Sequence, residues 1–182
     1  MKDRFSMHGW VELVHTRDGV RMPVWRENRL GKWLRRCWGA SSRGLLFLGC
    51  WADSLAIPNT ITNKGHAMAN GKMSNQGGYG TSTYLAIGTG TQGSPSTATA
   101  LSAEISTNGG ARALATASQV TTSVANDTTQ LVYTWTFSGS FAITEEGVFD
   151  AASTGNMPCY QSFTAINVVS SDQLTVTHKY QT

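Results

Sequence analysis

Strict alternation between large apolar and small side chains in the second half of the chain is the feature that most constrains its fold. In the segment LVYTWTF (131–137), Leu131, Tyr133, Trp135 and Phe137 take every second position, and Val or Thr fills the others. Successive side chains of a β-strand point to opposite faces of a sheet. The segment therefore predicts a strand with one aromatic, buried face.

Shorter segments with the same alternation surround this strand, and turn-forming clusters such as NGG (108–110) and SSD (170–172) separate them. Short strands at this spacing are typical of antiparallel β-sandwiches and barrels. We predict a mainly β chain in which residues 81–182 form an antiparallel, jelly-roll-like β-sandwich. The predicted core consists of Leu85, Ile87, Leu101, Leu131, Tyr133, Trp135, Phe137, Ile143, Val148, Phe149, Phe163, Ile166, Leu174 and Val176.

The first part of the chain begins with a hairpin signal. Residues 9–25 contain two apolar-rich runs joined by Arg17-Asp18-Gly19. Asp-Gly between such runs indicates a β-hairpin, because a type I′ turn needs positive φ at both central residues. Pro23 cannot donate a ladder hydrogen bond, so we expect the second run at a sheet edge.

Residues 28–39 predict an amphipathic helix. Asn28 is a suitable N-cap and Gly39 a suitable stop. Apolar side chains recur with helical spacing at Leu30, Trp33, Leu34, Cys37 and Trp38, and cationic side chains lie on the other side at Arg29, Lys32, Arg35 and Arg36.

The chain between this helix and the predicted sandwich is less regular. Residues 43–57 are apolar and fit either a second helix or a buried strand and turn, and residues 59–70 predict a short, weak helix. The glycine-rich residues 71–80 indicate a link. We therefore predict an N-terminal anchoring and assembly segment over residues 1–80, made of a hairpin and short helices, and a β-sandwich domain over residues 81–182.

Charge is unevenly distributed. Residues 1–50 hold ten of the fourteen Lys and Arg residues but only four of the eleven Asp and Glu residues. A basic end can meet an anionic partner or form a solvated helix face. We do not expect nucleic-acid binding through Arg35 and Arg36, because Trp33 and Trp38 lie on the opposite, apolar stripe, where they fit a protein–protein contact better.

The cysteines and apolar runs bear on the compartment. Cys37, Cys50 and Cys159 are an odd number and lack zinc-site spacing, so we interpret them as buried thiols in a reducing compartment. The first ten residues lack the apolar core of a signal peptide, and the longest apolar run, residues 44–51, is too short to cross a bilayer. We expect no membrane partner.

Two motifs resemble chemical sites. GTGTQG (88–93) matches the G-x-G-x-x-G dinucleotide pattern, but a poor helix former follows it, so we expect a tight loop at a sheet edge. Glu145, Glu146 and Asp150 could form an acid pair or a calcium site, but they lack calcium-loop spacing. We expect them to be turn carboxylates at a strand end.

The sequence contains no recognisable catalytic constellation. His8, His15, His66 and His178 are scattered, and no nucleophile-elbow motif accompanies them. We therefore predict that the chain is not an enzyme and has no catalytic residues, cofactor or metal site.

The order of several short motifs resembles a group of tailed-bacteriophage virion proteins with small β-domains. The motifs are YLAIGTGTQGSPSTATALSAEI (84–105), VYTWTFS (132–138), ITEEGVFD (143–150) and DQLTVTHKYQ (172–181), and residues 9–28 fit more loosely. The group includes head-decoration, neck and tail-associated proteins.

This resemblance implies a non-enzymatic structural component of a virion, assembled in the host bacterial cytoplasm as one copy in a symmetric array of capsid or tail proteins. We expect a head-decoration or minor capsid protein, with a tail, neck or fibre-attachment protein as the alternative. Residues 29–57 depart from the family pattern and are richer in Trp, Arg and Cys. The expected partner interface is Trp25, Arg29, Trp33, Arg35, Arg36, Trp38 and Trp51.

A glycan-binding adhesion module is the alternative from another functional class. Such modules expose planar aromatic side chains in a row. Most aromatic residues of the predicted sandwich alternate into its core, which leaves Tyr79, Tyr160 and Tyr180 as the exposed candidates.

Overall fold

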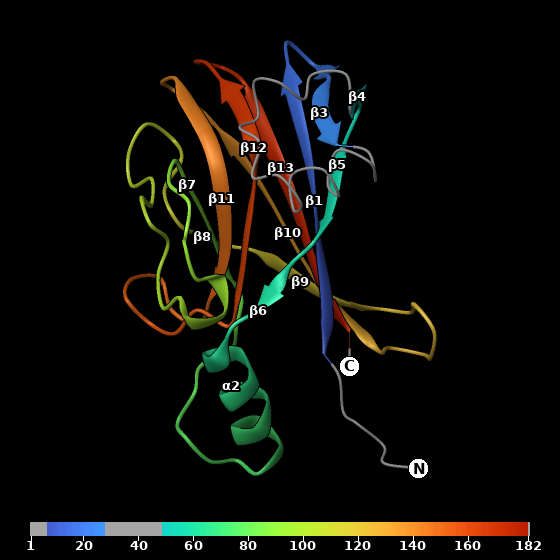
Figure 1. Cartoon of the computed structure of the whole chain (residues 1–182), viewed down its shortest axis with the longest axis vertical. Helices are drawn as coiled ribbons and strands as arrows, with labels where there is room; N and C mark the ends of the chain where they lie inside the picture. Colours follow the sequence, from blue (N-terminus) through green and yellow to red (C-terminus); the bar gives the residue numbers. More distant parts are fainter. Residues whose placement is uncertain (1–6, 28–48, 182) are drawn as a thin grey trace.

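The computed structural model describes residues 7–27 and 49–181, in which two antiparallel sheets pack face to face and a third sheet has only two strands (Figure 1). The first sheet has the order β2 (Val20–Met22), β1 (His8–Arg17), β13 (Gln173–Gln181), β10 (Thr128–Thr136) and β9 (Thr116–Val120), and β5 (Leu55–Pro58) also pairs with β1. The second sheet has the order β6 (Thr60–Ile61), β12 (Cys159–Val168), β11 (Phe141–Phe149), β7 (Tyr84–Gly88) and β8 (Ala113–Leu114). This architecture confirms the mainly β, antiparallel sandwich, while its likeness to a jelly roll stays a prediction.

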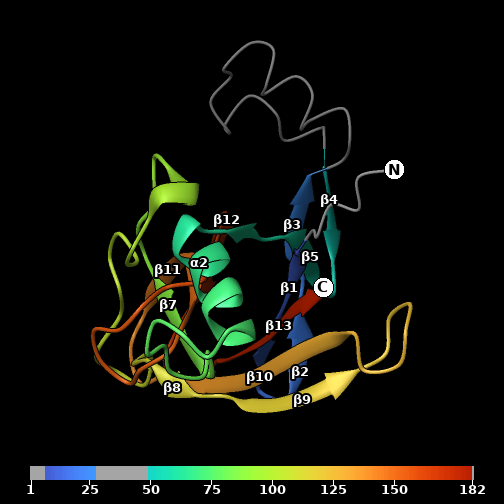
Figure 2. The same ribbon diagram turned by 90° about the horizontal axis from the view of Figure 1, so that it is seen from below.

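The helix α2 (Asn63–Met73) closes one end of the sandwich (Figures 1 and 2). It starts at residue 63 rather than 59 because Thr62 caps it, its hydroxyl accepting a hydrogen bond from the Gly65 amide at 3.0 Å. Gly65 weakens the helix but permits close packing, since a Cβ there would lie 2.3 Å from the carbonyl oxygen of Pro158.

Strand β1 is an integral strand of the first sheet, which corrects the expectation of a separate N-terminal segment. It pairs along its whole length with β13, and β2 and β5 share its other edge. The strands β5 and β6 precede residue 81 but belong to the first and the second sheet. Both sheets therefore contain strands from each side of the expected boundary. The predicted turn is confirmed, with Asp18 and Gly19 at φ values of 50° and 76°.

The main core lies between the sheets. Twelve of the fourteen residues expected in the core are buried, and Tyr133 and Phe163 are partly buried against it. Val11 and Leu13 of β1 are fully buried beside them. A smaller cluster covers the outer face of the second sheet, where Leu101 and Met157 pack with Phe149 and Tyr160.

A register shift between Ile143 and Glu145 changes which side chains of β11 face the core. Ile143 and Val148 belong to the main core, whereas Phe149 belongs to the outer cluster. An extra residue in one strand moves the following side chains to the other face of the sheet. The shift therefore turns Glu146 inward, toward β13, and Glu145 outward.

The remaining sequence-based expectations divide between described and undescribed residues. The apolar segment 43–57 contains two strands in its described part, β4 (Gly49–Ala52) and β5, rather than a helix. The helix expected over residues 28–39 lies outside the described residues. Within the described residues, no helix is long and apolar enough to cross a lipid bilayer.

Candidate functional site

The first candidate site is a two-stranded ribbon formed by β3 (Val24–Glu27) and β4, here called the tryptophan ribbon. Trp25 and Trp51 lie opposite each other in its register. Their rings meet edge to face, with centroids 5.5 Å apart and an interplanar angle of 74°. Val24 is buried in the main core and fixes the ribbon to the sandwich, whereas 66% of the Trp51 surface is exposed. The ribbon thus presents a large aromatic side chain to solvent.

The structure brings together two of the seven residues expected at a partner interface, Trp25 and Trp51. The other five, Arg29, Trp33, Arg35, Arg36 and Trp38, lie outside the described residues. In sequence, all five fall in the connection between β3 and β4, so the tryptophan ribbon forms the base of that connection.

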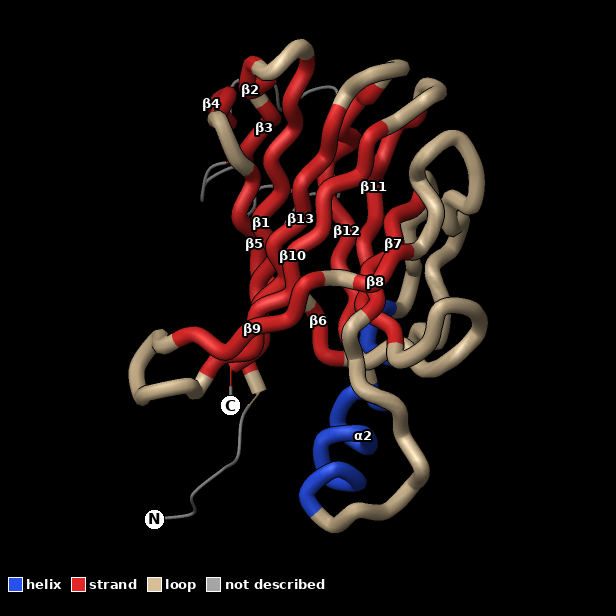
Figure 3. Tube along the Cα trace, turned by 180° about the vertical axis from the view of Figure 1, so that it is seen from behind, coloured by secondary structure: helices blue, strands red, loops and turns tan. Residues whose placement is uncertain are grey.

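The second candidate surface is the outer face of the first sheet. Figure 3 shows this sheet from outside, with none of the described helices or loops laid over it. The side chains of β10 and β13 that alternate with the inward-facing ones are mostly Thr and Gln, and the Thr134 and Thr175 hydroxyls hydrogen-bond at 2.8 Å. On these two strands the outer face is thus polar and carries one charged side chain, Lys179, which suits contact to another protein.

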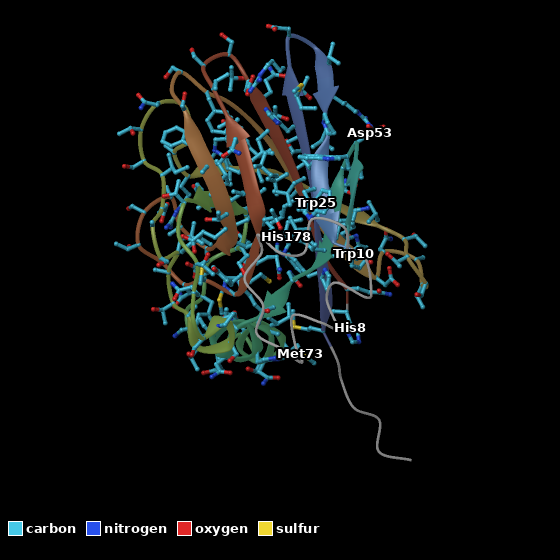
Figure 4. The ribbon with its side chains drawn as sticks, turned by 45° about the horizontal axis from the view of Figure 1, so that its top comes forward. His8, Trp10, Trp25, Asp53, Met73 and His178 are labelled. Carbon is cyan, nitrogen blue, oxygen red and sulfur yellow. The ribbon has the colours of Figure 1, made fainter. Side chains whose placement is uncertain are left out.

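A polar cluster that the sequence did not indicate lies inside the sandwich (Figure 4). His178 of β13 and Glu146 of β11 are both fully buried, and His178 Nδ1 lies 3.0 Å from a Glu146 oxygen. Nε2 of His178 lies 2.6 Å from Nδ2 of Asn59. The cluster therefore connects both sheets and the segment after β5.

Burial lowers the pKa of His178, but the negative charge of Glu146 and the hydrogen bond that its carboxylate accepts from His178 Nδ1 outweigh burial and raise the pKa above its ordinary value. A protonated imidazole donates from both nitrogens and needs an acceptor at Nε2. Rotating the Asn59 amide by half a turn places its Oδ1 atom next to His178 Nε2. Without this rotation, the buried Oδ1 atom has no hydrogen-bond partner. We therefore assign that orientation to Asn59.

A second buried carboxylate, Asp172, fixes the turn before β13. It accepts hydrogen bonds from His15 Nε2 at 2.8 Å, from Arg17 Nε and Nη2 at 2.7 Å, and from the Val169 amide at 2.9 Å. The Arg17 hydrogen bond acts most strongly and, against burial, holds the pKa of Asp172 well below its usual range. These hydrogen bonds occupy both oxygens of the carboxylate, which indicates a structural role.

Glu145 and Glu146 are buried within β11 and are not turn carboxylates at a strand end, so that expectation was wrong. Glu145 accepts hydrogen bonds from the Ser102 and Ala103 amides at 3.1 and 2.8 Å and from the Tyr160 hydroxyl at 3.1 Å. It thereby fastens the loop after β7 to the second sheet. Asp150 does follow the strand end and binds the Asn156 amide at 2.6 Å.

The GTGTQG motif forms part of this loop. It follows β7, as expected, and leads to a three-residue 3₁₀ turn, Pro95–Thr97, rather than to an α-helix. Gly88 and Gly90 allow close approach to the Glu145 carboxylate, because a Cβ at either would lie 2.5 to 3.0 Å from its Oε1 atom. The first two glycines thus serve packing around Glu145.

A cavity of about 510 Å³ lies between α2 and the ends of β9, β10 and β13. Met68 and Ala69 of α2 form one wall, and Leu131, Cys159 and Tyr180 line the sandwich side. The cavity is mainly apolar and adjoins the His178 cluster through Tyr180, whose ring centroid lies 6.1 Å from that of His178. Among the described residues, no group of three or more His, Cys, Asp or Glu side chains is placed to hold a metal ion.

Comparison of the chain with protein-family models, curated protein sequences and solved structures finds no match. The assignment of a function therefore depends on the geometry of the chain itself and on the sequence resemblance stated above.

The aromatic residues expected to be exposed for glycan binding are not arranged as a row. Tyr160 is fully buried, which corrects its placement, and Tyr79 and Tyr180 are partly buried. The two Trp rings of the ribbon are nearly perpendicular rather than coplanar. Among the described residues, these side chains therefore do not form a coplanar row.

Proposed function

We propose that this chain is a non-enzymatic structural subunit of a tailed-phage virion and that it docks on neighbouring virion proteins through the tryptophan ribbon. The observation that carries the proposal is the exposure of Trp51 while it is braced edge to face by Trp25. An ordered, exposed Trp is the kind of side chain that contributes most to protein–protein binding, because it buries a large area and loses little conformational freedom.

The sequence next to the ribbon supports the same use. The connection between β3 and β4 contains Trp33, Trp38, Arg29, Arg35 and Arg36, and Trp and Arg are both enriched at the centre of protein interfaces. A contact centred on Trp51 can therefore extend over this connection. We infer a capsid or tail protein as the partner.

The outer face of the first sheet, over which no described helix or loop lies, provides a second contact for a symmetric array. Its Thr side chains can pack against another protein without the desolvation cost of charged groups. Two separate contact surfaces on one subunit allow the head-to-tail contacts from which rings and larger arrays are built.

Within the virion, head decoration or a minor capsid role is our first proposal, and a tail, neck or fibre-attachment role is the alternative. The motif order described above supports the phage assignment as a whole and favours none of these positions strongly. In each case the chain is synthesised in the host cytoplasm and functions in the particle.

The test uses particles of the phage that encodes the chain. We expect the wild-type protein to co-purify with intact virions and Trp51→Ser to be lost from them. Val124→Ser is the matched control, because Val124 is 69% exposed and lies in the loop between β9 and β10, away from the ribbon. Equal incorporation of both variants, with both folded by circular dichroism, would contradict docking through the ribbon.

A further inference from the structure

The cavity beside α2 has no role in the proposed docking. It lies at the end of the sandwich that α2 closes (Figure 2). One face of the helix lines it, through Gly65, Met68, Ala69, Lys72 and Met73. This spacing of i, i+3, i+4, i+7 and i+8 places the five residues on one side of an α-helix. The helix therefore forms a continuous wall along one side of the cavity.

The helix packs closely against the sandwich at its start only. Gly65 lies so close to Pro158 that a Cβ would be 2.3 Å from the Pro158 carbonyl oxygen. Met68 is 4% exposed, whereas Met73, the last residue of the helix, is 77% exposed. The end of the helix therefore borders the cavity where it meets solvent, and Met73 lies at this opening.

Small and adaptable side chains shape this space. Ala69 of α2 and Ala117 of β9 both border the cavity, and neither side chain is long enough to reach across it. Protein interiors contain few voids larger than a water molecule. A cavity of about 510 Å³ is instead in the range of small-molecule sites, which are concave and mainly apolar. The flexible Met68 and Met73 side chains can adapt to the shape of a bound molecule.

The charged side chains among the described lining residues are Lys72 and Asp127, and both already have partners. Lys72 donates a hydrogen bond to the Tyr79 carbonyl at 2.6 Å. Asp127 accepts hydrogen bonds at 2.8 to 2.9 Å from three successive backbone amides, those of residues 122–124. The cavity therefore suits an uncharged molecule better than an ion.

Tyr180 supplies a polar group on the sandwich side of the cavity. Its hydroxyl lies 3.5 Å from the Ser82 carbonyl oxygen, which is too far for a strong hydrogen bond, and both residues line the cavity. Burial raises the pKa of Tyr180 to about 12, so the phenol stays protonated at neutral pH. The hydroxyl can therefore exchange its weak contact for a hydrogen bond to one polar atom of a bound molecule.

We propose that the cavity binds a small, uncharged, mainly apolar molecule that carries one polar group and hydrogen-bonds through it to the Tyr180 hydroxyl. The apolar part of the molecule packs between Met68 of α2 and Leu131 of β10. It enters past Met73, at the solvent-exposed end of the helix. Binding is non-covalent and does not depend on the proposed docking through Trp51.

The first test uses two fluorescent probes with the same aromatic skeleton. N-phenyl-1-naphthylamine is neutral, and its 8-sulfonate carries a negative charge. In titrations of the full chain we expect the neutral probe to bind with a Kd of about 10 μM and the sulfonate to bind at least about tenfold more weakly, because burying an unpaired charge is costly. Equal binding of the two probes, or no saturable binding of the neutral one, would overturn the proposal.

Methionine methyl groups report where the probe binds. In a chain labelled with ¹³C at the methionine methyl groups, the neutral probe should shift the NMR signals of Met68 and Met73, which line the cavity. The signals of Met22 and Met157 should stay unchanged, because these residues do not line it. Shifts confined to Met22 or Met157 would place the probe elsewhere and overturn the proposal.

Two helix variants separate binding in the cavity from binding to the protein surface. Ala69→Trp places a large ring in the cavity wall, and we expect it to weaken the neutral probe by about tenfold or more. Ala67→Trp is the matched control, because Ala67 is exposed on the same helix and does not line the cavity. It should bind like the wild type, as should Trp51→Ser, so loss of the ligand and loss of docking are separate results. Equal affinities of the Ala69 and Ala67 variants would contradict binding in this cavity.

Tyr180→Phe tests the hydrogen bond with little change of shape. Naphthalene and 1-naphthol compete with the neutral probe, and only 1-naphthol has a hydroxyl. We expect the wild-type protein to bind 1-naphthol about fivefold more tightly than naphthalene, and Tyr180→Phe to bind the two about equally. The same preference in both proteins would overturn the hydrogen bond assigned to Tyr180.

Residues 1–6 are the competing occupant from the chain itself, because Met7, which follows them, lines the cavity. A chain that starts at Met7 should bind the neutral probe with the wild-type affinity. Binding that appears only after this deletion would show that the N-terminal residues occupy the cavity, and would overturn the proposal.

Discussion

Leu13 of β1 lies directly opposite Val176 of β13 in the middle of the first sheet, although the two residues come from opposite ends of the chain. Both side chains are fully buried in the main core. This pairing makes the first sheet depend on a strand that precedes every other described element. The N-terminal strand is therefore part of the fold that carries the candidate sites.

A fragment of residues 81–182 is expected to be largely unfolded. Without β1, the edge of β13 loses its partner and the core loses Val11 and Leu13. Far-UV circular dichroism and amide proton dispersion of the fragment test this expectation. A folded fragment with native-like dispersion would show instead that β1 is dispensable.

In the full chain, Leu13→Ala should cost about 2–5 kcal/mol of unfolding free energy, measured in urea.

The first and third glycines of GTGTQG should respond differently to substitution by Ala. A Cβ on Gly88 would lie 2.5 Å from Glu145 Oε1 and 2.6 Å from the Ala103 backbone oxygen, whereas a Cβ on Gly93 meets nothing within 4 Å. We expect Gly88→Ala to lower the unfolding free energy by about 2–4 kcal/mol and Gly93→Ala to change it by less than about 0.5 kcal/mol. Similar values for both variants would be incompatible with packing of Gly88 against Glu145.

The His178–Glu146 pair predicts a dependence of stability on pH. Because folding raises the pKa of His178, the native state holds a proton that the unfolded state releases above about pH 6.5. Stability from this proton is complete below that pH and declines as the pH rises toward the folded-state pKa. Between pH 6 and pH 8.5, urea unfolding should show a loss of about 1–3 kcal/mol.

The control for this pH dependence is a change at an exposed histidine. His66→Gln should retain the pH slope of the wild type, since His66 is exposed on α2. His178→Gln, where it folds, should flatten the slope over the same range. A wild-type protein equally stable at both pH values would contradict a charged His178.

Asp172 should make the fold sensitive to acid. Folding lowers the pKa of Asp172, mainly through the hydrogen bonds from Arg17. Its stabilisation is therefore present above the ordinary carboxylate pKa and is lost as the pH falls below about 3.8. Asp172→Asn should lower the unfolding free energy by about 2 kcal/mol at pH 7. This value is smaller than expected for a fully buried ion pair, because Arg17 is partly exposed and solvent screens its charge. Asp53→Asn is the control, because Asp53 is exposed. An equal loss of unfolding free energy in both variants would contradict stabilisation of the fold by the Asp172 hydrogen bonds.

The sequence predicted the β-sandwich and most of its core because alternation is a local property that each strand displays by itself. The segment around Trp135 is the clearest case. The partner of a strand is not a local property, so the hairpin that contains Leu13 was assigned to a separate segment although its turn was predicted correctly.

The buried polar clusters could not be predicted for a related reason. The shift between Ile143 and Glu145 inverts the strand faces by one residue. The segment Glu145-Glu146-Gly147 indicates a bulge or turn nearby, but it does not define the residue at which the faces invert. Without this shift, the alternation of β11 would place Glu145 rather than Glu146 on the inner face. The pairing of Glu146 with His178 thus depends on the exact position of a backbone irregularity and on a contact between distant strands, and local alternation determines neither.

Electron cryo-microscopy of intact particles from the phage that encodes the chain tests the central claim most directly. We predict density for the two-sheet body on the head or tail surface, with Trp51 enclosed by a neighbouring protein. Particles that lack this density, or a bound subunit whose Trp51 faces solvent, would contradict docking through the tryptophan ribbon.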